Sequence, residues 1–324
     1  MNNITGFELQ TSQWDGASYI TTSKEGYKIV NFDEFAYNPA RINIGSIGLF
    51  KDKIGIVSSL YVVFKITKDI MPEYLLILMK TKKFNKKILA RQEGGVRSYF
   101  FYENFSKVKI YIPPKLDEQR KIVNFLDLIN LKINLIEAKI DTLKKYKKGL
   151  IIYLLSNGIK TEKFANYIEY ISKTSFASSD GKEKGNYPFY INSTDGNYKF
   201  TDSYTHEGKH LIVNTGGQAF IQISEEKFSA MADNLIIKIR NNLYGVYYYL
   251  KRIETRINYI GFQGTGIRHL DQNWLKRQYV ILPPISDKKI ESLEENTNNY
   301  IKILEIKLKK LHLIKMQLMK DLFI

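Results

Sequence analysis

Residues 112–155 read IPPKLDEQRKIVNFLDLINLKINLIEAKIDTLKKYKKGLIIYLL, and this stretch decides how the chain is expected to fold. From Ile122 its apolar residues recur in alternating steps of four and three, through Leu126 and Ile129 to Leu143. Such steps average about 3.5 residues, which is the heptad seam of a left-handed coiled coil. The stretch therefore predicts a long helix whose single apolar stripe needs a partner.

A second copy of the same pattern, at residues 282–324, supplies that partner: LPPISDKKIESLEENTNNYIKILEIKLKKLHLIKMQLMKDLFI. Its apolar seam is equally long and has one polar member, Thr297. Each copy opens at a Pro-Pro pair followed by an aspartate, Asp117 or Asp287, which stabilises the positive end of a helix dipole. Because neither helix is stable in water with an exposed apolar stripe, we expect the two to pack against each other.

The repetition extends upstream of both helices. GGVRSYFFYENFSKVKIYIPP precedes the first and GTGIRHLDQNWLKRQYVILPP precedes the second, so that Arg97 in the first half is answered by Arg268 in the second. Each half also has an expected apolar strand followed by an expected helical stretch, at 55–66 and 71–88 in the first half and at 228–239 and 241–257 in the second. The chain is therefore predicted to be one unit, a basic α/β domain plus a long helix, written twice.

The predicted fold class is α/β, or α+β, with two domains joined by two long helices that pack as an antiparallel coiled coil. A pseudo-two-fold axis relates the two halves. The predicted segments are a first domain at 1–112, a central helix at 113–156, a second domain at 157–282 and a C-terminal helix at 283–324. The first domain is expected to be N-terminally short, because the stretch before the first Pro-Pro pair is shorter than the stretch between the two helical segments.

Composition limits the class of protein. The chain of 324 residues is 44% hydrophobic and 25% charged, values ordinary for packed domains, and it has no cysteine. The lack of cysteine excludes a disulfide framework and a thiolate metal site, and it fits a reducing compartment. No apolar run reaches the ~18 residues that span a membrane, and the N-terminus lacks a signal-peptide pattern. We therefore expect a cytoplasmic protein.

The net charge of +16 points to a polyanionic partner, above all nucleic acid. Residues 1–116 hold +7 and residues 156–284 hold +4, whereas the helical segments 117–155 and 285–324 hold +3 and +2. The excess therefore lies mostly in the two globular domains. The alternative is a lysine-rich surface that only interacts with water.

The order of basic domain, PP…DEQRKI helix ending in KKGLIIYLL, second basic domain and second PP helix resembles the specificity subunit of type I restriction-modification enzymes. The block at 113–150 carries the most specific part of this resemblance, which covers nearly the whole chain. It implies a non-catalytic subunit with two target-recognition domains, each of which reads one half of a split sequence in double-stranded DNA. The long helices would set the gap between the halves and dock two adenine methyltransferase subunits, and a restriction/translocase subunit would join them for cleavage.

The resemblance also implies which residues and cofactors take part. Glu118, Gln119 and Arg120 of the DEQR block are predicted to dock the partner. No cofactor is expected in this chain, and S-adenosylmethionine is expected in the methyltransferase partner.

The residues predicted to contact DNA lie in polar loops, turns and basic stretches of the two domains. In the first domain they are Asn38, Arg41, Asn43, Lys51, Lys53, Lys83 and Arg97, and in the second they are Thr215, Gln218, Gln222 and Arg268. Lysines neutralise phosphates, whereas Arg, Asn and Gln side chains read base edges in the grooves. For Lys83 the alternative is a solvated helix face, and for Arg97 and Arg268 it is a turn arginine bonded to backbone carbonyls.

Two other functions stay open from the sequence. GVY at 245–247 and YIG at 259–261 have a spacing close to that of a GIY-YIG nuclease, with Arg268 and Glu291 downstream. Such a nuclease needs a hairpin turn between the two motifs, and 248–258 contains no Gly, Pro or Asn-Gly turn. A purely structural coiled-coil adaptor is the second alternative. The four histidines show no metal-site pattern, so no metal is predicted. No catalytic residue is predicted either.

Overall fold

The computed structural model describes residues 6–8, 25–91, 99–196 and 198–323. The chain divides into two compact units. Unit 1 comprises Met1–Ala138 together with Ile306–Ile324, and unit 2 is the uninterrupted stretch Lys139–Glu305. Each unit therefore combines one globular part with portions of both long helices.

The main sheet of unit 1 has three antiparallel strands in the order β3-β2-β5. Ala36 in the central strand pairs with Gly48 on one side and Val63 on the other. A separate antiparallel pair joins β1 to β4. The strand bounds are β1 Lys28–Asn31, β2 Phe35–Tyr37, β3 Ile47–Leu49, β4 Ile54–Val57 and β5 Val62–Phe64.

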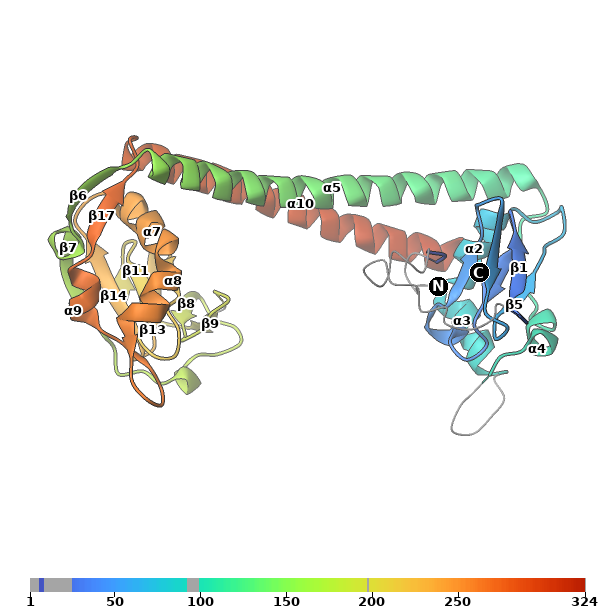
Figure 1. The fold of residues 1–324 in the computed structure, drawn as a ribbon, viewed down its shortest axis with the longest axis horizontal. Helices are drawn as coiled ribbons and strands as arrows, with labels where there is room; N and C mark the ends of the chain where they lie inside the picture. The colour runs from blue at the N-terminus through green and yellow to red at the C-terminus, as the bar shows by residue number, and fades with distance from the viewer. Residues whose placement is uncertain (1–5, 9–24, 92–98, 197, 324) are drawn as a thin grey trace. The chain divides into compact units, whose positions relative to one another are not determined.

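Among the described residues of unit 1, three short helices follow these strands, and two of them, α2 and α3, pack beside the sheet (Figure 1). Their bounds are α2 Pro72–Met79, α3 Lys82–Leu89 and α4 Tyr102–Ser106. A proline opens α2, where its missing N–H costs nothing, and the hydroxyl of Thr81 caps α3 by accepting a hydrogen bond from the Phe84 N–H. The core includes Leu126 of the first long helix and Phe323, whose ring lies 5.1 Å from that of Tyr74.

Unit 2 contains two four-stranded sheets, in the orders β12-β11-β14-β7 and β10-β13-β8-β9. Two small antiparallel pairs, β15-β16 and β17-β6, complete it. The bounds are β6 Ile159–Lys163, β7 Ile168–Ser172, β8 Tyr187–Tyr190, β9 Tyr198–Thr201, β10 His206–Glu207, β11 Leu211–Asn214, β12 Ile221–Ile223, β13 Lys227–Ala230, β14 Asn234–Ile239, β15 Phe262–Gln263, β16 His269–Leu270 and β17 Tyr279–Leu282.

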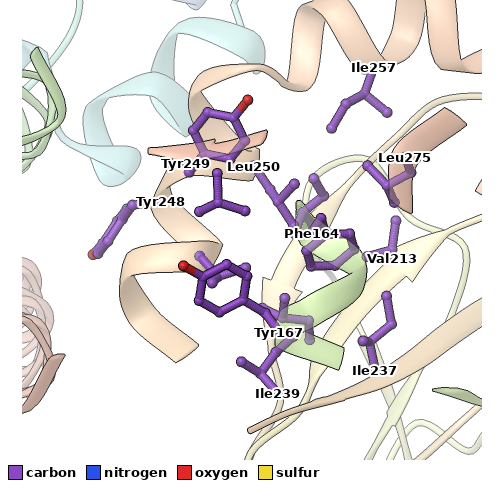
Figure 2. Packing of buried hydrophobic residues seen from close by; sticks show 14 of the residues in the cluster. Phe164, Tyr167, Val213, Ile237, Ile239, Tyr248, Tyr249, Leu250, Ile257 and Leu275 are labelled. Carbon is purple, nitrogen blue, oxygen red and sulfur yellow. The ribbon is translucent and has the colours of Figure 1, made fainter. Parts of the chain in front are cut away.

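The helices of unit 2 close its core against the sheet of β11 and β14. They are α6 Phe164–Tyr167, α7 Leu243–Arg252, α8 Glu254–Arg256 and α9 Gln272–Lys276, with a π-helical turn at Ile257–Gly261. Figure 2 shows side chains from α6 and α7 meeting Val213 of β11 and Ile237 of β14. Tyr248 lies at the edge of this cluster, and its hydroxyl points away from it to bond with Glu294. The tyrosines of α7 are thus largely core residues, as their helical spacing indicates.

The two predicted long helices are present as α5 Leu116–Ser156 and α10 Asp287–Asp321. The Pro-Pro pairs lie just outside them. Within unit 2, the Lys144 ammonium lies 3.3 Å from Glu305 and that of Lys147 donates to Asn298 at 3.0 Å, so the two helices run antiparallel. Within unit 1, His312 Nε2 lies 3.7 Å from a Glu137 carboxylate oxygen, which continues the same pairing.

Burial confirms only part of the predicted seam, because its members Leu293 and Ile314 in α10 are 42% and 50% exposed. In α5, Leu126, Ile129, Ile133 and Ile140 are each at most 8% exposed. In α10, Ile301 and Leu304 are 8% and 5% exposed. The predicted fold class, mixed helix and strand with two long helices, is therefore confirmed.

Two of the expected elements are wrong in the same way in both halves. The strand expected at 55–66 is β4 and β5 with a turn between them, closed by a hydrogen bond from the Tyr61 N–H to the Ser58 carbonyl at 3.0 Å. The strand expected at 228–239 is β13 and β14 with a turn closed by the Asn234 N–H on the Met231 carbonyl at 3.1 Å. The helical stretches also divide, into α2 and α3 in one unit and α7 and α8 in the other.

The described helices include none that is both long enough and apolar enough to span a membrane.

Candidate nucleic-acid interface

In each unit a polar loop follows the central strand of the main sheet. In unit 1 the loop joins β2 to β3, and the Asn38 N–H closes it by donating to the Ser46 carbonyl at 3.0 Å. In unit 2 the loop joins β11 to β12, and the Asn214 N–H donates to the Phe220 carbonyl at 3.2 Å. Gly45 and Gly217 take positive φ values of 95° and 75° in these loops, a region that favours glycine. The two loops therefore occupy equivalent places in the repeat.

A second segment rests on each loop. The Phe100 N–H donates to the Pro39 carbonyl at 3.0 Å in unit 1, and the Leu270 N–H donates to the Thr215 carbonyl at 2.9 Å in unit 2. Phe100 and Leu270 have the same separation along the chain as the two Pro-Pro pairs. In unit 2 the Gly217 N–H also donates to the Arg268 carbonyl at 2.9 Å. The segment after the repeated Gly-x-Arg motif thus holds the polar loop in both units.

The structure brings three of the unit 1 predictions together in one loop. Asn38 is half-buried, and its side-chain oxygen accepts a hydrogen bond from the Ala40 N–H at 2.9 Å. Arg41 is exposed just before a short 3₁₀ turn, Ile42–Ile44, that contains the half-buried Asn43. Arg41 is therefore the side chain of this loop that is most available to a ligand.

The two lysines predicted beyond this loop differ from each other. Lys51 bonds to Asp33 at 2.7 Å and also to Glu73, so its charge is compensated within the chain. Partial burial acts to lower the pKa of Lys51, but the two carboxylates outweigh this effect and raise that pKa. Lys53 is exposed in the turn before β4. Arg97 lies outside the described residues.

Lys83 lies on α3, which contacts the 3₁₀ turn of the unit 1 loop. It is exposed, as are its neighbours Lys82 and Lys86. Lys87 instead donates to the Lys109 carbonyl at 2.6 Å. The exposed lysines of α3 are therefore in position to extend the positive surface beside the loop.

In unit 2 only one of the four predicted residues is fully presented to solvent. Gln218 is exposed at the loop, whereas Thr215 is buried and its hydroxyl donates to the Asp233 carbonyl at 2.9 Å. Gln222 lies in β12, and its amide nitrogen is buried with no hydrogen-bond partner among the described residues. The Arg268 guanidinium donates to the carbonyls of Asn258 at 2.8 Å, Tyr259 and Phe262, as the alternative interpretation expected.

Several polar side chains near the unit 2 loop were missed by the sequence analysis. The Asn192 amide donates to the Gly216 carbonyl at 3.2 Å, although Asn192 is far from the loop in sequence. His269 pairs with Gly216 in an isolated bridge, and Gln263 and Thr265 are exposed in the same turn. The sequence repeat aligns the segment before Leu270 with the segment before Phe100. The polar residues at 263–269 could therefore have been predicted to lie beside the loop. Asn192 has no such sequence signal.

The geometry contradicts the nuclease alternative. Gly245, Val246 and Tyr247 lie inside α7, and the YIG residues end the π-helical turn at Ile257–Gly261. The chain between them is helical, whereas the motif needs a hairpin. Among the described residues no group of three or more His, Asp and Glu could hold a metal ion.

Comparison with known families matches residues 14–145 and 160–312 to the type I restriction modification DNA specificity domain. The two matched segments together cover most of the chain, one in each half of the repeat. The chain belongs to this family. It is a specificity subunit of the type I restriction-modification class, and that subunit is non-catalytic.

Solved structures show the same fold. The S subunit of a type I restriction-modification system from M. genitalium matches with a TM-score of 0.60 and 14% identity, over 92% of this chain and 84% of that one. HsdS from Thermoanaerobacter tengcongensis matches with a TM-score of 0.51 and 13% identity, over 94% and 83%. A chain from a study of complex assembly and conformational transition of the type I R-M system gives 0.55 and 14%, over 91% and 83%. No curated protein sequence gives a significant match.

The predicted docking residues of the specificity subunit lie in the first turn of α5. Glu118 and Arg120 are exposed, and Arg120 pairs with Asp117 at 3.1 Å. Gln119 is fully buried. Its side-chain oxygen accepts from the Met71 N–H at 2.7 Å, and its nitrogen donates to the carbonyls of Asp69 at 3.0 Å and Pro113 at 2.9 Å. Gln119 thus anchors α5 to the start of α2, and the predicted docking surface reduces to Glu118 and Arg120.

Asp287 performs the corresponding task in unit 2. Its carboxylate accepts from the N–H groups of Gly245 at 2.8 Å and Tyr244 at 3.3 Å, at the start of α7. Burial raises the pKa of Asp287, and these backbone donors oppose that rise. Each long helix of the specificity subunit is therefore attached to a helix of a recognition domain by a polar side chain, the buried Gln119 at α2 and the half-buried Asp287 at α7.

A second apolar stripe of α5 remains uncovered in unit 1. Phe125, Leu128, Leu131 and Leu135 are 49%, 64%, 55% and 62% exposed. They lie three or four residues apart, which places them along one face of the helix. Stripes of exposed apolar side chains are a feature that protein interaction sites share.

Proposed function

We propose that the chain reads a bipartite DNA sequence and directs adenine methyltransferase subunits to it. The single observation that carries the proposal is the pair of equivalent loops, each held by the segment after a Gly-x-Arg motif. The exposed residues on these loops differ, with Arg41 in one unit and Gln218 in the other. Two equivalent supports with different side chains suit the recognition of two different half-sequences.

The chemistry of the loops fits base readout and phosphate binding. Arg and Gln can make paired hydrogen bonds to guanine and adenine edges in the major groove. Exposed lysines such as Lys53 and Lys83 would neutralise phosphates and make the affinity depend on salt. Thr215 and Arg268 support the unit 2 loop rather than contact bases, because their polar atoms are bonded within the chain.

The uncovered stripe of α5 supports the docking of a partner. Phe125 and Leu128 together with the exposed charges of Glu118 and Arg120 offer an apolar strip beside a polar end. In this proposal the methyltransferase subunit covers the strip and binds S-adenosylmethionine, and a restriction/translocase subunit joins the complex for cleavage.

The experiment is methylation mapping. The chain is co-expressed with the adenine methyltransferase subunit of its own operon, and methylated adenines are located across a genome. The expected result is one bipartite motif. Gln218→Ala should relax the motif in one half and Arg41→Ala in the other, whereas Asn299→Ala, on the exposed face of α10, should leave it unchanged. Formation of a stable complex that methylates no bipartite site would contradict the proposal.

A further inference from the structure

A pocket of about 700 Å³ lies in unit 1 between the start of α3 and the last part of α10. Its charged lining is formed by Lys80, Lys82, Lys83, Lys86, Lys315 and Lys320. Met316, Met319 and Phe323 provide apolar contacts on the α10 side. We call it the lysine pocket.

The charge of the lysine pocket is uncompensated. No carboxylate belongs to its lining, and none of its six lysines forms an ion pair with another described residue. His312 also lines it, and the only carboxylate paired with that ring among the described residues is Glu137, which lies outside the lining. Six ammonium groups around one cavity repel one another, and an anionic occupant would remove that cost.

The helix that forms one wall adds to the positive field. Lys82 and Lys83 occupy the first turn of α3, which contains no acidic residue. The start of a helix carries partial positive charge, so that lysines there are unfavourable and anions are favoured. Partial burial, together with the ammonium of Lys315, lowers the pKa of Lys80. These groups therefore form a concentrated positive site, unlike the mixed charges of an ordinary surface.

The equivalent pocket of unit 2 shows the contrast. It lies between α7, the last part of α5 and the first part of α10, with a volume of about 980 Å³, and Lys251 belongs to its lining. There Lys144 pairs with Glu305 at 3.3 Å and Lys251 with Glu254 at 2.6 Å. Lys147 pairs with Glu294 at 2.5 Å. Three of the six cationic side chains that line the unit 2 pocket are thus paired with carboxylates, whereas none of the six lysines of the lysine pocket is paired among the described residues.

We propose that the lysine pocket binds a compact phosphate ligand of the triphosphate class. A cavity of about 700 Å³ is of the size that holds a small molecule. Several lysines can each contact a different phosphate oxygen, and Met316, Met319 and Phe323 can accept an apolar ring attached to the phosphates. The same phosphate chemistry occurs in the DNA backbone, so the test must separate the two sources.

The test is calorimetric titration of the full chain at physiological ionic strength with inorganic tripolyphosphate and with a nucleoside triphosphate. Saturable binding of tripolyphosphate is expected, and Lys315→Gln or Lys80→Gln should weaken it at least about tenfold, because each removes a charged hydrogen-bond donor. Lys148→Gln and Lys302→Gln, which line the unit 2 pocket, should leave it unchanged. If the nucleoside triphosphate binds more tightly than tripolyphosphate, the apolar side chains of the pocket contact its base.

Three results would overturn the proposal. The first is a tripolyphosphate titration without saturable heat. The second is that the unit 2 variants weaken tripolyphosphate binding as much as the unit 1 variants do. The third is that Lys315→Gln weakens binding of a short DNA duplex while tripolyphosphate does not bind at all. Circular dichroism and the unfolding midpoint check that the variants are folded. Should Lys80→Gln lower the midpoint, Lys86→Gln on the exposed side of α3 is used in its place, with the same weakening expected.

Discussion

One polar side chain in each unit bonds the start of a long helix to its recognition domain. Gln119 in unit 1 accepts from a backbone N–H at the start of α2, and Asp287 in unit 2 accepts from backbone N–H groups at the start of α7. The two residues are not at the same repeat position, since the Pro-Pro register pairs Asp287 with Asp117. Both halves keep a hydrogen-bond acceptor for the backbone N–H groups at the start of a domain helix. The residue that provides this acceptor differs between the halves.

Gln119→Ala is expected to destabilise unit 1 by about 1–3 kcal/mol, because it leaves the Met71 N–H and two carbonyls without partners in a buried place. Gln119→Glu should cost more, since a carboxylate would face the Asp69 and Pro113 carbonyl oxygens. Urea unfolding measures both. Arg120→Ala, one residue further and exposed, is the control and should change the unfolding free energy by less than about 0.5 kcal/mol. Equal effects of Gln119→Ala and Arg120→Ala would refute this role.

Two histidines of unit 2 should make its stability depend on pH. The rings of His206 and His210 lie 5.9 Å apart, and His210 is fully buried with Nδ1 donating to the Gly208 carbonyl at 2.7 Å and Nε2 accepting from the Tyr170 hydroxyl at 2.8 Å. Burial lowers the pKa of both, and the charge of Lys238 lowers that of His210 further. The folded chain therefore binds fewer protons than the unfolded chain below the ordinary histidine pKa of about 6.5.

Stability is accordingly expected to be complete above about pH 6.5 and to fall as the pH drops below it, by up to about 1.4 kcal/mol per pH unit for each histidine. Unfolding free energies at neutral and mildly acid pH give the slope. The double variant His206→Gln with His210→Gln should have a flatter slope, whereas His312→Gln, an exposed residue, should keep the original one. A slope that does not change in the double variant would assign the acid sensitivity to other groups.

At the scale of elements, the heptad period is the most reliable guide in this sequence. It correctly predicts that Leu126, Ile133 and Ile140 lie on the buried side of α5, because an apolar stripe on a long helix must be covered. The pattern does not say that Phe125 and Leu128 stay uncovered, since an apolar side chain has the same signal in a core and on a docking surface.

Leu126→Ala and Leu128→Ala make a matched pair on α5. Leu126 is 1% exposed and its truncation should cost about 2–5 kcal/mol, because it leaves a cavity between α5 and the core of unit 1. Leu128 is 64% exposed, and its truncation should cost less than about 0.5 kcal/mol. Thermal unfolding of the two variants gives the comparison. A similar loss in both would mean that Leu128 is covered in the free protein.

Other elements were harder to predict because their signals are local and weak. The turns at Ser58–Tyr61 and Met231–Asn234 contain neither Gly nor Pro, so two continuous apolar stretches each concealed a turn. The sequence alone does not say whether the Arg268 guanidinium binds a DNA phosphate or backbone carbonyls. The position of the π-helical turn, which brings three carbonyls to it, decides between these two roles. The burial of Gln119 depends on contacts with residues far away in the sequence, at Asp69 and Met71.

At the scale of the whole molecule, the repeat is clearer in topology than in sequence. β3-β2-β5 in unit 1 and β12-β11-β14 in unit 2 share strand order and antiparallel direction, and the loops after β2 and β11 are held by equivalent hydrogen bonds. The loop sequences NPARINIGSIG and NTGGQAFIQIS have little in common. The framework has been kept in both halves while the exposed positions have diverged, which agrees with the proposal that the two domains read different half-sequences.

Independence of the two readers can be tested by exchange. Replacing residues 157–282 with the corresponding domain of another specificity subunit should change one half of the methylated motif and leave the other half unaltered. Sequencing that detects methylated adenine provides the measurement. Replacement of 1–112 is the reciprocal control and should change the other half. A change in both halves after a single exchange would show that the domains do not read separately.

The composition of the two units also sets an order of events during protein synthesis. Unit 2 is a single stretch of chain and can close as soon as Glu305 has left the ribosome, whereas the core of unit 1 includes Phe323. The domain that is translated first must therefore wait, with part of its apolar surface open to water, until all of unit 2 has been made. The earlier half of the nascent chain is thus the half most in need of chaperone protection.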